Sequence, residues 1–389
     1  MTTTLNTQLD YAIEHTQLHD RNESFLSLWR QLLSTSASPE KIYQTPEFFA
    51  FMEKTNSSDD RIELFSIRSI KTGQIIGIIP TRFRKLSFDF VAGSRNFAAP
   101  SINVIVLLGS VPLISLKPEL FECFLAYLFE QYPSCRALSM PTLPLESELL
   151  TYVQGSKTIE GQYRVHVLHG WRECHAIPLP SSFEQYLQQF SSKKRFNLKR
   201  QIRLLQEYGN GNLCLKRIEQ PEQINELTKA IRMIATPELL ATVTGENSFI
   251  ELARQGLLHS YILNCGDRPF AVILATRSDD VLHIHNICYP QELAHMSPGV
   301  SILHMAIEDL TNNFKFSSID LGYSNPGHKQ QSSNSIEIRG HLLVLRKTFP
   351  NRLLCVMHDV YLKQLNTLKK IVENYRQRQR DRKKANVAN

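Results

Sequence analysis

The 389-residue sequence lacks the marks of several large protein classes. Its seven cysteines are odd in number and scattered, without a Cys-x-x-Cys pair, so neither a disulfide framework nor a zinc ribbon is expected. The opening segment MTTTLNTQLDYAIEHTQLHD contains acids and no apolar core, which argues against a secretory signal. Without a P-loop or a Gly-x-Ser-x-Gly motif, NTPase and hydrolase interpretations have no motif support. Reduced thiols favour a cytoplasmic protein.

Long hydrophobic runs are also missing. The longest uncharged stretch, 96–116, is interrupted by Pro100, Asn103 and Pro112. We therefore expect a buried strand pair there and not a membrane span, which needs about 20 consecutive apolar residues. The remaining composition is that of an ordinary globular protein, with 42% hydrophobic and 21% charged residues. At roughly 150 residues per domain, the length predicts two or three domains.

Two halves of the sequence share one order of predicted elements. The first half gives a helix at 45–54, strands at 62–69 and 74–83, further strand to 116, a helix at 118–131 and a strand at 137–140. The second half gives strands at 261–264, 270–276 and 281–288, a helix from Pro298-Gly299 to 313, and a strand at 318–321. Two copies of one α/β unit are the simplest interpretation, and a chance echo between mixed α/β segments is the alternative.

The most informative local signal is His295-Met296-Ser297-Pro298-Gly299-Val300-Ser301-Ile302-Leu303, between a predicted strand and an amphipathic helix. The first N–H groups of a helix have no partner within it, and glycine lets a ligand approach the main chain. A phosphate or pyrophosphate is therefore expected at Ser297, Pro298, Gly299, Val300 and Ser301. A plain capping turn is the alternative.

This order of elements resembles the double-GNAT group of acyltransferases, which includes CelD-like acetyltransferases and FemABX-like aminoacyl transferases. The residues that carry the resemblance, over about 43–347, are Tyr43-Gln44-Thr45-Pro46-Glu47-Phe48, Phe183-x-x-Tyr186-Leu187, Ser192 to Arg200, Ser297-Pro298-Gly299 with Leu303, and Ile319-Asp320-Leu321-Gly322 with Lys329. One departure is Ser324 to Lys329, where such proteins usually have an acidic residue and Tyr-Lys. The acceptor site is therefore expected to differ.

The resemblance implies an α/β fold with a mixed sheet, built from two tandem GNAT-like domains. We expect a degenerate domain at 1–180, a catalytic domain at 181–350 with a basic connecting helix at 185–208, and a C-terminal helix with a basic tail at 351–389. The first copy is interpreted as degenerate because Ser115-Leu116-Lys117-Pro118-Glu119 lacks glycine and places Glu119 where it would repel phosphate. The implied acyl donor is acetyl-CoA, and no metal is expected.

Basic residues concentrate in two places, although the net charge is only +7. Around Lys193 to Arg203, a Ser-capped helix is predicted with Leu198 on its buried stripe and Lys194 near the apolar side. Acceptor binding is assigned to Lys194, Arg195 and Lys329, against the alternative of a solvated charged face.

Strand 281–288 carries a His-x-His pair. Period two places His283 and His285 on one face, and no third metal ligand stands at a useful spacing. In the resembled family the general base often comes from this strand, so His285 is the expected base and Tyr323 the expected donor of a proton to the thiolate. Two ordinary core histidines and a packing tyrosine are the alternative.

The second basic region is the tail, where Tyr361, Leu365, Leu368, Val372 and Tyr375 recur at helical spacing before RQRQRDRKKANVAN. This helix is compatible with an acidic partner, a partner helix, an anionic membrane surface or nucleic acid, of which nucleic acid is the least expected. Docking on its own domain is the alternative.

The favoured function is acyl-CoA-dependent N- or O-acyl transfer, with acetyl-CoA as donor, to a small-molecule, glycan, lipid or sugar-nucleotide acceptor, as in polysaccharide biosynthesis. Two alternatives remain: FemABX-like aminoacyl transfer from charged tRNA, and a non-catalytic binding protein on a retired transferase fold. The long helical hairpin that some relatives use for tRNA is missing, which disfavours the first alternative.

Overall fold

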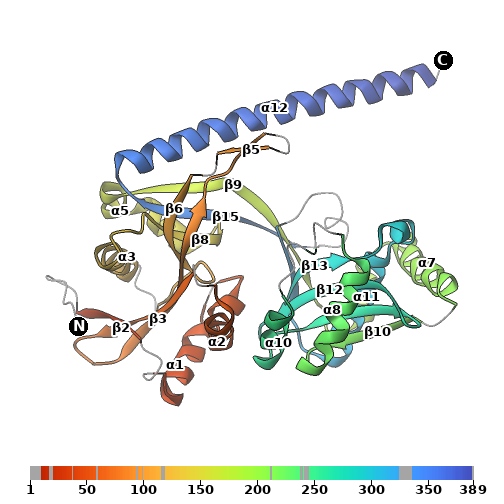
Figure 1. Cartoon of the computed structure of the whole chain (residues 1–389), viewed down its shortest axis with the longest axis horizontal. Helices are drawn as coiled ribbons and strands as arrows, with labels where there is room; N and C mark the ends of the chain where they lie inside the picture. Colours follow the sequence, from red (N-terminus) through yellow and green to blue (C-terminus); the bar gives the residue numbers. More distant parts are fainter. Residues whose placement is uncertain are drawn as a thin grey trace. The chain divides into compact units, whose positions relative to one another are not determined.

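The computed structural model describes residues 10–16, 21–36, 38–57, 60–92, 95–98, 100–114, 119–210, 213–236, 240, 245–323 and 335–387. The chain divides into two compact units (Figure 1). The first unit comprises residues 1–18, 59–171 and 340–389, and the second comprises 19–58 and 172–339.

The first unit contains a sheet with the strand order β1-β2-β3-β6-β8, followed by parts of β15 and β9. Its strands are β1 Tyr11–His15, β2 Arg61–Ser69, β3 Ile75–Ser87, β6 Ser101–Leu107, β7 Leu113–Ile114, β8 Ala137–Pro144, β9 Tyr163–Pro178 and β15 Ser335–Arg346, with a separate hairpin of β4 Phe90–Ala92 and β5 Arg95–Ala98. Its helices are α3 Glu119–Gln131, α4 Glu148–Gly155, α5 Lys157–Gln162 and the 39-residue α12 Phe349–Val387.

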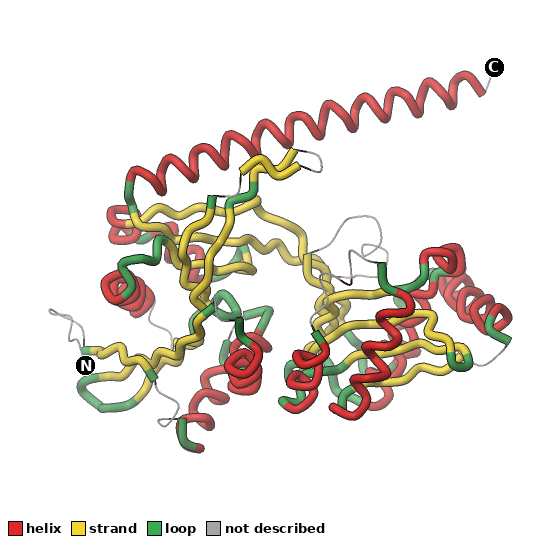
Figure 2. The backbone as a smooth tube through the Cα atoms, viewed as in Figure 1, coloured by secondary structure: helices red, strands yellow, loops and turns green. Residues whose placement is uncertain are grey.

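The second unit continues from β9 through β14-β13-β12-β11-β10. Its strands are β10 Leu213–Ile218, β11 Ser260–Cys265, β12 Arg268–Arg277, β13 Val281–Cys288 and β14 Ser318–Tyr323. Its helices and 3-10 turns are α1 Glu23–Ser34, η2 Lys41–Gln44, α2 Pro46–Thr55, α6 Phe183–Gln188, α7 Ser192–Tyr208, η3 Pro221–Gln223, α8 Ile224–Ile234, α10 Glu246–Arg254, η4 Gln291–Met296 and α11 Pro298–Asn313. Figure 2 shows these strands between helices.

The predicted internal repeat is confirmed by the topology. In the first unit β1, β2, β3 and β6 form an antiparallel series, and α3 connects β6 to β8, which pairs parallel to β6. In the second unit β10, β11, β12 and β13 repeat that series, and α11 connects β13 to its parallel neighbour β14. The fold is therefore mixed α/β with two tandem copies of one unit.

The division of the chain differs from the predicted one at two segments. Residues 19–58 pack with the second unit, where Ile42 joins the core of α8 and α10. Strand β9 runs from the first copy into the second unit and pairs with β14, whereas β15 returns to the first unit, so α12 belongs there and is no separate tail. Local sequence patterns do not report such an exchange, because it depends on pairing between distant strands.

The second unit buries both faces of β12. Ala271, Ile273 and Ala275 contribute to a core with residues of α6, α7 and α11, whereas Val272 and Leu274 pack with α8 and α10. This double coverage explains the near-continuous apolar sequence of the strand. The side chains of β13 therefore face either the α7–α11 side or the α8–α10 side of the sheet.

The predicted basic helix is present as α7, with Ser191 as its N-cap and Leu198 and Leu205 on its buried side. The expected single helix at 185–208 is wrong in its bounds, because α6 ends at Gln188 and a new helix begins at Ser192. All seven cysteines are free thiols. Among the described helices, none combines the length and the apolar sequence needed to traverse a bilayer.

Candidate active site

The parallel strands β13 and β14 pair over three residues only. The register runs from Val281 opposite Ser318 to His283 opposite Asp320 and ends there, although both strands continue. Beyond this point the facing backbone groups of the two strands are not joined in a ladder. A substrate with amide groups can bind to strand edges of this kind.

Both strands are also irregular just past the last pair. On β12 the adjacent residues Leu274 and Ala275 oppose Asn286 and Ile284, which leaves His285 as the extra residue of a β-bulge. On β14 the register against β9 shifts between Asp320 and Tyr323. Gly322 lies in that shift at φ 63°, a left-handed conformation that glycine adopts without steric cost.

Helix α11 follows β13 and η4, its start packs against Ile287 and Tyr289 at the end of β13, and this start is not capped by a side chain. Ser297 occupies the N-cap position in a left-handed conformation, φ 56°, and its hydroxyl accepts no hydrogen bond from the helix. Pro298 is the first helical residue, and no acid stands in the first turn. Pro298 has no N–H, and the amides of Val300 and Ser301 donate to the Ser297 carbonyl at 3.1 Å. The helix dipole and the Gly299 amide are therefore what would favour an anion here.

The structure assigns Gly299 a packing role that the sequence did not indicate. A side-chain carbon at this position would lie 2.9 Å from Cε1 of Tyr289 and 3.4 Å from Cγ2 of Ile287. A side chain at position 299 would therefore displace the Tyr289 ring, so glycine serves the packing of the helix start against β13. The Ser301 hydroxyl donates to the Ser297 carbonyl at 3.3 Å and is buried.

His283 and His285 lie on the α8–α10 side of the sheet. Thr276 is the register partner of His283, and its Oγ1 lies 2.8 Å from Nε2 of His285. The predicted shared face is therefore present, despite the bulge. His285 is an exposed residue. The protein atoms around its ring nevertheless lower its pKa, whereas the carboxylate of Asp320 acts in the opposite direction and raises it.

His283 is buried beside a charged network. Its Nδ1 lies 3.9 Å from Oδ2 of Asp320, which accepts a hydrogen bond from Nη1 of Arg339 at 2.9 Å. Burial lowers the pKa of His283 to about 4, so the ring is neutral at neutral pH. Its Nε2 is buried without a hydrogen-bond partner, which costs free energy unless a bound molecule supplies one.

Tyr323 ends β14 with its ring against a cation. The Arg172 guanidinium lies 3.8 Å from the ring centroid, and burial raises the pKa of Tyr323 to about 12. The phenol therefore keeps its proton at neutral pH and can donate it. Glu40, which acts on the same phenol electrostatically, comes from the segment before η2.

The structure does not bring Lys194 and Arg195 together with the histidines. Lys194 lies on the α7–α11 side, with Nζ 3.9 Å from the centroid of Phe190, and burial lowers its pKa. Arg195 donates from Nη2 to Ser192 Oγ at 3.2 Å. Lys329 lies outside the described residues.

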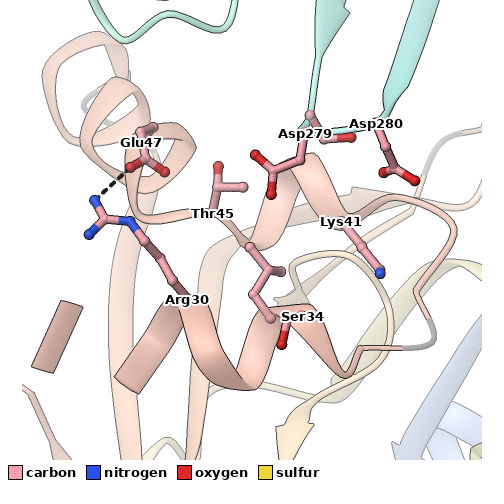
Figure 3. Close-up of a pocket in the computed structure, with 9 residues that line it drawn as sticks. Arg30, Ser34, Lys41, Thr45, Glu47, Asp279 and Asp280 are labelled. Carbon is pink, nitrogen blue, oxygen red and sulfur yellow. Dashed lines mark hydrogen bonds and ion pairs between the residues drawn. The ribbon is translucent and has the colours of Figure 1, made fainter. Parts of the chain in front are cut away.

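A pocket of about 200 Å³ lies within the second unit, next to the start of β13 (Figure 3). It is lined by Arg30, Leu33, Ser34, Lys41, Thr45, Glu47, Ser278, Asp279 and Asp280. Arg30 donates to Glu47 at 2.9 Å, whereas two further carboxylates enter from the β12–β13 turn. The pocket therefore presents both signs of charge.

Sequence reasoning missed this pocket and the part that the N-terminal segment plays in it. The one available signal was Tyr43-Gln44-Thr45-Pro46-Glu47-Phe48, which matched the resembled group without receiving a role. Thr45 caps α2 by accepting from the Phe48 amide at 3.1 Å. Among the described residues, no group of three or more His, Cys, Asp or Glu side chains is arranged to bind a metal.

Residues 192–330 match the family described as Acetyltransferase (GNAT) domain. The fold of the chain is similar to that of FemX, with a TM-score of 0.57 and 8% identity over 88% of this chain and 99% of that one. It is similar to a tandem GNAT protein from the clavulanic acid biosynthesis pathway, with a TM-score of 0.50 and 9% identity over 86% and 98% of the two chains. It is also similar to a conserved protein of unknown function from Bacteroides thetaiotaomicron, with a TM-score of 0.50 and 9% identity over 82% of this chain and 97% of that one.

The fold and the family match together define the class. The chain has a tandem GNAT fold, and it is an acyltransferase with its GNAT acetyltransferase domain in the second half. No protein of curated function matches the chain in sequence.

Proposed function

We propose that the second unit transfers an acyl group, acetyl in the first instance, from acyl-CoA to an amine or hydroxyl of a glycan, lipid or sugar-nucleotide precursor. The observation that carries this proposal is the early end of the β13–β14 pairing at His283, while the start of α11 packs against Ile287, in the part of β13 that β14 leaves unpaired. The strand edges suit the amides of a pantetheine arm, and the segment Ser297 to Ser301 suits a pyrophosphate.

His285 is the proposed general base. It takes the proton from the acceptor nucleophile as that atom attacks the thioester carbonyl. The C–S bond then breaks, and Tyr323, whose pKa of about 12 keeps the phenol protonated, donates its proton to the departing thiolate. The hydroxyl of Thr276 holds the His285 ring in place.

The charged pocket is the proposed site for the acceptor end remote from the reacting atom. Asp280 lies three residues before His283 on the same chain segment and acts electrostatically on that ring. Carboxylates and cations within one hollow suit a polar acceptor that carries charges of both signs. This assignment moves the acceptor contacts from Lys194 and Arg195 to the N-terminal segment and the β12–β13 turn.

Isothermal titration calorimetry of the purified chain with acetyl-CoA tests the proposal. We expect saturable heat at micromolar to millimolar ligand, and no heat at millimolar acetyl-CoA would overturn the assignment of the donor.

Aminoacyl transfer from charged tRNA is the second candidate, and the composition of α7 favours it. The helix carries six Lys or Arg residues against the single acid Glu207, and a positive helix surface can bind a phosphate backbone. Radiolabel in the product distinguishes the candidates, because it enters from labelled acetyl-CoA in one case and from labelled aminoacyl-tRNA in the other.

A further inference from the structure

Helix α12 carries most of the exposed apolar side chains of the described chain. Nine of the sixteen large hydrophobic residues with exposed side chains lie on this one helix. Contiguous apolar surface of this kind marks an interaction site on a folded protein.

These residues form a stripe along one side of the helix. Positions 349, 353, 356, 360, 364, 368, 371 and 375 follow one another at intervals of three or four, which keeps them on one side. Seven of the eight are apolar, and their exposed fractions run from 43% at Val356 to 78% at Phe349. At 1.5 Å per residue the stripe is about 39 Å long.

The opposite side of the helix is already used by the first unit. Cys355 and His358 are fully buried, and Asn351 accepts a hydrogen bond from Arg136 at 2.6 Å and donates one to the Arg346 carbonyl at 2.8 Å. The exposed stripe is therefore a second apolar face, beyond what the docking of α12 requires.

The whole charge excess of the chain is located in the same helix. Between Lys363 and Lys384 there are nine Lys or Arg residues against Glu373 and Asp381, a balance of +7. This equals the net charge of all 389 residues, so the rest of the chain is neutral overall. An apolar stripe that continues into a basic segment is complementary to an anionic lipid surface.

We propose that α12 lies along an anionic membrane surface, with its stripe toward the acyl chains and its basic segment among the headgroups. The helix lies on the surface and does not cross it, because none of the described helices meets the requirement for a span. A second copy of the helix in parallel fits less well, since that pairing would bring two segments of charge +7 together. Nucleic acid offers no partner for an apolar stripe of about 39 Å.

Sedimentation of the full chain with vesicles tests the proposal. We expect binding to vesicles of phosphatidylcholine with phosphatidylserine, weak binding to phosphatidylcholine alone, and a loss of binding as salt increases. Leu368→Asp should lower the bound fraction about tenfold, because it places a carboxylate within the stripe.

Asn366→Asp is the matched control, since it changes the net charge equally at an exposed position away from the stripe. It should retain most of the binding.

Equal losses in the two variants, or no binding of the wild type to anionic vesicles, would overturn the proposal. A wild-type dimer that Leu368→Asp converts to a monomer, without vesicle binding, would assign the stripe to a second copy. Binding of duplex DNA or RNA without vesicle binding would overturn it in favour of nucleic acid. None of these measurements depends on acyl transfer.

Discussion

Arg339 donates a hydrogen bond from Nη1 to Oδ2 of Asp320 at 2.9 Å, and both side chains are buried. Burial alone would lower the pKa of Arg339, but the carboxylates of Asp320 and Glu337 raise it. The second oxygen of Asp320 accepts from the Gly322 amide at 2.6 Å, inside the irregular part of β14. One carboxylate therefore fixes the strand bend and neutralises the buried cation beside His283.

Asp320→Asn should destabilise the second unit by about 3 kcal/mol, because it leaves the buried guanidinium without its main counter-charge. The midpoint of urea denaturation measures the effect. Glu337→Gln is the control, since the Glu337 side chain is 45% exposed and its loss should cost at most about 1 kcal/mol. Equal midpoints for the two variants would contradict this ranking.

His285→Gln should lower the turnover rate by about 10² or more, because it removes the proposed base while keeping a polar side chain. Acetyl-CoA affinity should remain near that of the wild type. His283→Gln is the control on the same strand and should be milder. Steady-state kinetics measures the turnover of both variants, and calorimetry measures their affinity for acetyl-CoA. Unchanged turnover in His285→Gln would exclude His285 as the base.

The pH dependence of turnover separates the two rings further. Only a neutral imidazole accepts a proton, so the rate should rise with pH through the pKa of the base. Because the pKa of His285 lies below its ordinary value, the midpoint of this rise in rate should lie below about pH 6.5. A rise in rate with its midpoint near pH 4 would indicate His283 as the base instead. A flat profile would exclude both.

Most elements of the repeat could be predicted because they depend on local periodicity. The predicted strand 281–288 and helix 298–313 agree with β13 and α11 to the residue, and 62–69 agrees with β2 within one residue. The prediction omitted β9, whose sixteen residues mix His, Arg and Glu with apolar residues and alternate poorly. Its pairing with β14 is a long-range contact that no local pattern encodes.

The candidate site divides in the same way. The start of α11 and the histidine pair could be found because each lies within one short segment. The pocket could not, since it joins residues of α1 and η2 to the turn at 278–280, more than 200 positions away. The packing of Gly299 against Tyr289 was also hidden, because a glycine in the sequence does not tell which atoms approach it.

Acid should destabilise the first unit through His358. This ring is fully buried, neither of its nitrogens has a hydrogen-bond partner, and burial lowers its pKa to about 4. Since the unfolded chain binds a proton near pH 6.5 and the folded one does not, stability is present above that pH and is lost as the pH falls toward 4.

His358→Phe removes this titration within a cluster that already contains Phe88 and Phe90. Between pH 7 and pH 5 we expect the free energy of unfolding of the variant to fall by about 1–2 kcal/mol less than that of the wild type. Urea denaturation at the two pH values measures this difference. An unchanged pH dependence would show that other groups determine the acid sensitivity.

Asp279→Asn should raise the KM for the acceptor by about tenfold without a change in acetyl-CoA affinity, because the residue lines the charged pocket and lies away from α11. Asp267→Asn, in the turn between β11 and β12, is the control for a lost surface carboxylate. A normal acceptor KM in Asp279→Asn would remove the pocket from the acceptor site.

Val300→Glu tests the start of α11 as the pyrophosphate site. An acid in the first turn stabilises a helix by about 0.3–1 kcal/mol through the dipole, so the fold should be retained. The same charge should repel the pyrophosphate and raise the Kd of acetyl-CoA by about tenfold or more. Val300→Gln is isosteric with that variant but uncharged, so it separates repulsion from the loss of partial packing of Val300. Calorimetry should show near wild-type affinity for Val300→Gln and weak affinity for Val300→Glu. Equal affinities would place the donor phosphates elsewhere, because a carboxylate next to a bound pyrophosphate must weaken its binding by charge repulsion.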